Sequence, residues 1–97
     1  MSVVALTAEG YKIAIITASG SGSVGAGATG TIRISLPLGP LSKILHVLGV
    51  RAITVSGGTA YIVSFSATSA GVDVTLYNPG TSAVTYTVNV AVAVLGV

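Results

Sequence analysis

Apolar and polar residues alternate with a period of two along most of the chain, between short segments rich in glycine, serine and proline. In residues 31–36, isoleucine or leucine occupies every second position and polar residues lie between them. A period of two is typical of β-strands that are buried on one face and exposed on the other. Because the helical period of 3.6 is almost absent, the pattern predicts an all-β protein.

Six or seven strands follow from this pattern. Gly57-Gly58 indicates a tight hairpin turn, and Asn78-Pro79-Gly80 indicates a turn in which Pro79 fixes φ and Gly80 permits a positive φ. In residues 59–67 we expect Tyr61, Val63 and Phe65 to face inward. The expected strands cover residues 11–18, 31–36, 41–55, 59–67, 72–77 and 83–95.

Residues 41–55 are the ambiguous segment, because their leucines and isoleucines would also form a helical stripe. The β-branched residues Val47, Val50 and Ile53 favour a strand, with a short helical turn at 41–45 as the alternative. We therefore predict a single β domain over residues 1–97, an antiparallel β-sandwich or jelly-roll-like barrel of about six to eight strands.

The composition predicts self-association. Hydrophobic residues make up 52% of the chain and charged residues 6%, whereas an ordinary soluble domain has about 25% charged residues. A domain of 97 residues buries only about 60–70% of its unfolded surface. The surplus apolar surface therefore needs a partner.

A membrane is the alternative place for apolar surface, and residues 52–72 and 74–97 carry no charge. Glycine, serine and threonine interrupt both stretches, so neither is expected to be a membrane-spanning helix. The N-terminus has no basic segment before an apolar core, and we therefore expect no signal peptide.

Gly20, Gly22 and Gly25 match the G-x-G-x-x-G spacing of dinucleotide-binding proteins. That site needs a helix to start at the glycines, but β-branched residues follow them here. We therefore expect residues 19–30 to be a flexible loop and predict no nucleotide cofactor.

Catalytic groups are scarce. Glu9 and Asp73 are the two carboxylates, His46 is the one histidine, and there is no cysteine. General acid–base catalysis and metal binding both need several such groups close together. We predict no enzymatic activity, no metal, no cofactor and no small-molecule substrate.

Four basic or titratable residues, Arg33, Lys43, His46 and Arg51, fall within one short window and could form a modest basic patch. The aromatic residues are not arranged for base stacking, so nucleic-acid binding is not expected.

The terminal strand carries the positive signal. Residues 83–89 alternate, but after Asn89 both faces of the strand are apolar, and a small sandwich covers only one of them. We predict a homo-oligomer, a trimer or larger, whose interface includes Val90, Ala91, Val92, Ala93, Val94, Leu95 and Val97.

The run "VDVTLYNPGTSAVTYTVNVAVAVLGV", residues 72–97, resembles the C-terminal part of small β-sandwich structural proteins of tailed phages and related viruses. The resemblance implies a non-enzymatic capsid, decoration or tail component that is located in the virion and contacts other virion proteins. One alternative is a subunit of an extracellular filament or pilus, in which residues 1–6 or 90–97 supply a donated strand. Another is a small glycan- or surface-binding module.

Overall fold

The computed structural model describes residues 2–6, 10–39 and 41–97. These residues contain seven β-strands and no helix. The alternative of a helical turn at 41–45 is therefore wrong over the described residues of that segment. The strands are β1 (Ser2–Leu6), β2 (Lys12–Val24), β3 (Thr29–Ser35), β4 (Ile44–Ser56), β5 (Tyr61–Ala67), β6 (Gly71–Tyr77) and β7 (Val84–Gly96).

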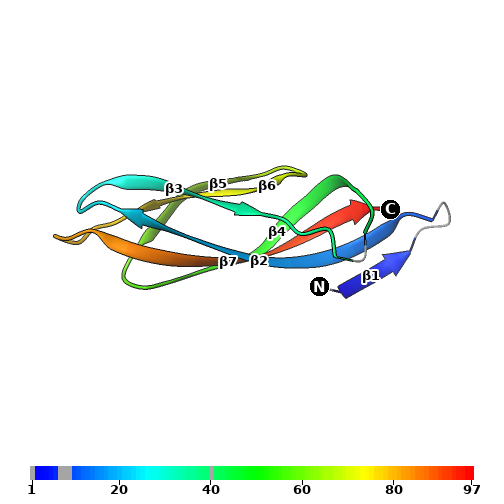
Figure 1. The fold of residues 1–97 in the computed structure, drawn as a ribbon, viewed down its shortest axis with the longest axis horizontal. Coiled ribbons are helices and arrows are strands. Elements are labelled where there is room, and N and C mark those ends of the chain that lie inside the picture. The colour runs from blue at the N-terminus through cyan, green and yellow to red at the C-terminus, as the bar shows by residue number, and fades with distance from the viewer. Residues whose placement is uncertain (1, 7–9, 40) are drawn as a thin grey trace.

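The strands form two sheets that lie face to face (Figure 1). The four-stranded sheet has the order β1-β2-β7-β4, and the three-stranded sheet has the order β3-β6-β5. Every pairing is antiparallel. This confirms the predicted antiparallel sandwich, and the two sheets are separate rather than closed into a barrel.

The molecule is a rod of 53 × 17 × 17 Å. Its length comes from β2, β4 and β7, which have 13 residues each and at about 3.3 Å per residue span roughly 43 Å. β7 lies between β2 and β4 and pairs with both along most of its length.

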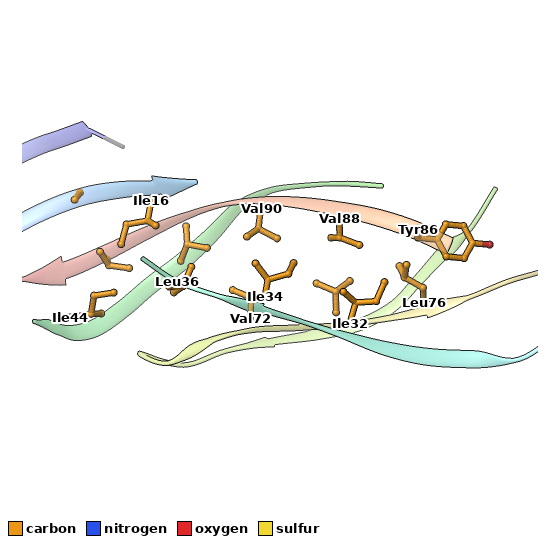
Figure 2. Close-up of a cluster of buried hydrophobic side chains, with 14 of the residues drawn as sticks. Ile16, Ile32, Ile34, Leu36, Ile44, Val72, Leu76, Tyr86, Val88 and Val90 are labelled. Carbon is orange, nitrogen blue, oxygen red and sulfur yellow. The ribbon is translucent and has the colours of Figure 1, made fainter. Parts of the chain in front are cut away.

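The core lies between the sheets. Tyr86, Val88 and Val90 of β7 face the three-stranded sheet, whose buried residues include Ile32 and Ile34 (Figure 2). These positions confirm the alternation predicted for residues 31–36 and for the terminal strand. The buried hydrophobic residues are Ala14, Ile16, Val24, Ile32, Ile34, Leu36, Leu41, Ile44, Val72, Val74, Leu76, Tyr86, Val88, Val90, Val92 and Val94.

The structure of β4 explains why the sequence of residues 41–55 is ambiguous between strand and helix. Its register against β7 shifts three times, between Ile44 and His46, Val47 and Gly49, and Val50 and Ala52. Each bulge adds one residue, so the residues that face the core recur every third position instead of every second. The helix-like spacing of apolar residues is therefore a strand with repeated bulges, and the preferred prediction of a strand is confirmed.

The predicted loop at residues 19–30 is wrong except for a short turn at residues 25–28. β2 continues through this stretch to Val24, fully paired with β7, and β3 begins at Thr29. A Cβ atom on Gly20 would lie 3.0 Å from Cγ1 of Ile34, and one on Gly22 would lie 3.1 Å from Cγ1 of Ile32. The glycines are strand residues that let β3 pass close to β2.

The Gly57-Gly58 turn also differs from its prediction. Gly57 has a φ of 110°, as a tight turn requires. However, β4 and β5 belong to different sheets, so the turn carries the chain across the sandwich and does not form a hairpin.

Asn78 organises the turn between β6 and β7. It is 1% exposed, and its Nδ2 donates hydrogen bonds to the carbonyl oxygens of Val24 at 3.1 Å and Ser82 at 2.9 Å. Its Oδ1 accepts a hydrogen bond from the amide of Gly80 at 2.9 Å. Gly80 is not among the described glycines with positive φ, so that detail of the predicted turn is wrong. The side chain of Asn78 closes the turn instead.

The close approach of strands at Gly71 gives a first prediction. A Cβ atom there would lie 2.5 Å from the carbonyl oxygen of Ile34, so Gly71→Ala must displace backbone. We expect it to lower the free energy of unfolding by roughly 1–3 kcal/mol in urea denaturation. Gly49→Ala is the matched control, because nothing lies within 4 Å of its added methyl group. Equal effects of the two substitutions would contradict this role of Gly71.

The buried amide of Asn78 gives a second prediction. Asn78→Ala leaves the carbonyl oxygens of Val24 and Ser82 without their donor and should cost about 2 kcal/mol of stability. Asn78→Asp should cost more at neutral pH, because a carboxylate cannot donate to either carbonyl. Urea denaturation of both variants measures this, and a variant with Asp as stable as the wild type would refute it.

Candidate self-association surfaces

The outer face of the four-stranded sheet is divided into an apolar part and a hydroxyl part. On β7, Thr85, Thr87 and Asn89 are exposed, whereas Ala91 and the outward residues that follow are half-buried. The predicted change after Asn89 is therefore present in the structure.

Neighbouring strands continue both parts through their register with β7. We define the apolar outer face as Ile13, Ile15, Ala91, Ala93 and Leu95. We define the hydroxyl outer face as Ser19, Ser21, Ser23, Thr54, Ser56, Thr85, Thr87 and Asn89, all of which are exposed.

The predicted interface residues fall on both faces of β7. Val90, Val92 and Val94 are 3%, 0% and 0% exposed, because they lie in the hydrophobic core of the same subunit. These three valines cannot contact a partner, so the predicted interface must be corrected at their positions. Ala91, Ala93 and Leu95 lie on the apolar outer face, and Val97 follows β7 at an exposed position.

A shallow cavity of about 370 Å³ lies where the apolar and hydroxyl outer faces meet. It is open because small side chains lie on three adjacent strands. The lining residues are Thr17, Ala18, Ser19, Ala52, Thr54, Asn89, Val90 and Ala91. None of them carries a charge, and the lining provides hydroxyl and amide groups but no acid or base.

A second apolar surface lies on β5, at the edge of the three-stranded sheet. We define the β5 edge as Tyr61, Ile62, Val63 and Phe65, which are 60%, 44%, 58% and 53% exposed. The prediction that Tyr61, Val63 and Phe65 face a core is therefore wrong.

A bulge accounts for this error. Ile62 pairs with Leu76 and Phe65 pairs with Val74, so these residues three positions apart share the inner face of the sheet, and the register shifts between Ile62 and Ser64. Ile62 and Phe65 are exposed, so the opposite sheet does not cover this part of the inner face. In Figure 1, β4 runs obliquely to β5.

Tyr61 lies on the other face of β5. Its ring stacks on that of Tyr77, with centroids 6.4 Å apart and an interplanar angle of 15°. The aromatic pair fixes the start of β5 against β6.

The predicted basic patch is divided between the two sheets. Arg33 lies on β3 and its Nε is 3.5 Å from Oδ1 of Asp73, an exposed ion pair of small energetic value. Lys43, His46 and Arg51 are exposed on or next to β4, in the other sheet. The structure therefore does not bring the four residues together.

The candidate catalytic groups are also apart. His46 lies on β4 of one sheet and Asp73 on β6 of the other, where it pairs with Arg33. Glu9 lies outside the described residues. Within residues 10–39 and 41–97, no three His, Asp or Glu side chains are grouped so that they could hold a metal ion. None of the described segments is a helix of the length and hydropathy needed to cross a membrane.

Comparison of the chain with protein-family models, with curated proteins and with solved structures gave no match.

The two faces of β7 give a third prediction. Ala93→Asp places a charge on the apolar outer face and should weaken self-association at least roughly tenfold, with a folded β spectrum in circular dichroism. Val92→Asp places a charge in the core and should prevent folding. Sedimentation velocity measures association.

Thr85→Asp is the control, because it introduces the same charge on the same strand but on the hydroxyl outer face. It should leave both folding and association unchanged. If Ala93→Asp associates as the wild type does, the apolar outer face is not an interface.

Proposed function

We propose that this protein is a non-enzymatic structural subunit that self-assembles into a homo-oligomer through apolar β-strand surfaces. The observation that carries the proposal is the β5 edge, where four large apolar side chains remain exposed on one short strand. Exposed apolar side chains along an unpaired edge strand typically mark an interaction site.

The apolar outer face supports the same proposal independently. It lies on the other sheet, so one subunit has apolar surfaces on two sides of its sandwich. A subunit with two contact surfaces can form closed rings and shells as well as pairs. Because the chain has so few charged residues, much of the surface of one subunit is apolar. Self-assembly through both surfaces would bury apolar area of this kind.

The arrangement of ionisable groups supports a structural role rather than catalysis. His46 and Asp73 lie on different sheets, and Asp73 already pairs with Arg33. A catalytic acid–base pair needs groups within hydrogen-bond reach of one substrate. The open cavity is lined by small neutral side chains, which fit packing against another subunit.

The resemblance of residues 72–97 to small β-sandwich structural proteins of tailed phages leads us to propose the virion as the location. In this proposal the protein is a capsid, decoration or tail component and contacts other virion proteins. The rod shape of 53 × 17 × 17 Å is compatible with a subunit that packs side by side with its copies.

Assembly state gives a fourth prediction. In size exclusion with light scattering, the wild-type protein should elute with a mass of at least three 9.5 kDa subunits, because both surfaces are then buried. A particle that stays at 9.5 kDa up to high concentration contradicts the proposal and favours a monomeric glycan- or surface-binding module.

Negative-stain microscopy of the same sample separates two forms of assembly. Rings or shells support a virion component. Long fibres support the alternative of an extracellular filament subunit joined by strand addition.

A further inference from the structure

β5 differs from the other edge strands in how its free edge is protected against pairing with another chain. Native proteins protect exposed edge strands with charges, prolines and bulges. β4 has three bulges and carries the exposed His46 and Arg51. β3 runs close to β2 at Gly20 and Gly22.

β5 has no such set of devices. It contains no charged residue and no proline over Tyr61–Ala67, and it has one bulge. Of the edge strands whose side chains the structure describes, it is the one that leaves its edge open for pairing.

The absence of charge favours a second copy of this chain as the partner. A two-fold axis places each residue near its own copy, so a charge at such an axis would repel its counterpart. Residues 52–72, which include all of β5, carry no charge. Because β5 has no charged side chain, it cannot recognise a charged partner through ion pairs.

The β5 edge supplies part of the apolar area that a homodimer contact needs. From the exposed fractions of its four side chains, the β5 edge exposes roughly 400 Å² of apolar side chain. This is about half of the ~800 Å² that each partner contributes to a standard interface. Pairing of the strand backbones would contribute further area.

We propose that β5 pairs antiparallel with β5 of a second copy about a two-fold axis. The two three-stranded sheets then become one continuous sheet across the dimer. This inference rests on the proposed self-assembly and specifies one of its contacts.

The bulge in β5 selects the register. Ile62 and Phe65 lie on the inner face, whereas Tyr61 and Ser66 lie on the outer face, as their partners Tyr77 and Asp73 do. A two-fold axis between Val63 and Ser64 places Ile62 opposite Phe65 of the second copy and Tyr61 opposite Ser66 of the second copy. A shift by one residue would place inner residues opposite outer ones.

This register gives two equivalent Ile–Phe cross-strand pairs at the centre of the contact. Pairs of aromatic and β-branched residues stabilise antiparallel sheets. If every copy makes the two-fold contact, the assembly contains an even number of subunits, and the apolar outer face on the other sheet can join these dimers into a larger closed particle.

A lysine on β5 tests the contact. Ser64 is exposed, so Ser64→Lys should fold as the wild type does. It places two like charges near the axis and should raise the dissociation constant of the dimer at least roughly tenfold, measured by analytical ultracentrifugation. Ser35→Lys is the control, because it makes the same change at an exposed position on β3 of the same sheet.

Disulfide cross-linking tests the register. The chain has no cysteine, so an introduced thiol reacts only with another introduced thiol. A mixture of Ile62→Cys and Phe65→Cys chains should form the mixed disulfide in excess over either homodimer. In the proposed register, Ile62 of one copy lies about 10 Å along the strand from Ile62 of the other, which is too far for a disulfide.

The outcomes separate this contact from the proposed function. Weaker association of Ser64→Lys with an excess of mixed disulfide supports β5 pairing. If the wild type is an oligomer, Ser64→Lys does not change its dissociation constant and the cysteine variants form no excess of mixed disulfide, then β5 pairing is overturned and self-assembly remains supported. A wild-type monomer at all concentrations overturns both.

Discussion

The packing of one face of β7 against the three-stranded sheet is the interaction on which the rest of the structure depends. Every second residue from Tyr86 to Val94 is buried, and β7 pairs with β2 on one side and β4 on the other. Because register fixes the face on which each side chain lies, the orientation of β7 determines which residues of β2 and β4 face the core. Tyr86 also anchors the crossover from β4 to β5, since its hydroxyl donates to the carbonyl oxygen of Thr59 at 2.8 Å.

Sequence reasoning predicted the regions where a strand keeps strict alternation. The all-β sandwich, the inner face of β3 and the two faces of β7 follow from the period of two. β4 shows the limit of this approach, because three bulges change its burial period from two to three. A period of three lies close to the helical period, so only the β-branched identity of Val47, Val50 and Ile53 favoured a strand.

Features that depend on contacts between distant segments could not be predicted. Gly20 and Gly22 were predicted to lie in a loop, because the sequence shows only that glycine is conformationally free. The close approach of β3, which requires glycine at these positions, is a tertiary contact that the sequence does not show. The change of character after Asn89 was visible on one strand, but its continuation by Ile13 and Ile15 required the register between β2 and β7. The β5 edge was missed because its alternation is typical of a core strand. The available signal was the lack of charge over residues 52–72.

β4 and β5 are edge strands of different sheets, and they differ in bulges and in charge. Bulges increase the twist of a strand and bend it, and β4 accordingly runs obliquely to β5 (Figure 1). The same bulges protect the edge of β4 from pairing with other chains. Ile62 and Phe65 are exposed on the inner face of their sheet, because the opposite sheet does not cover them. In the proposed dimer, β4 is the edge that its bulges and charges protect, and the uncharged edge of β5 is the one that pairs.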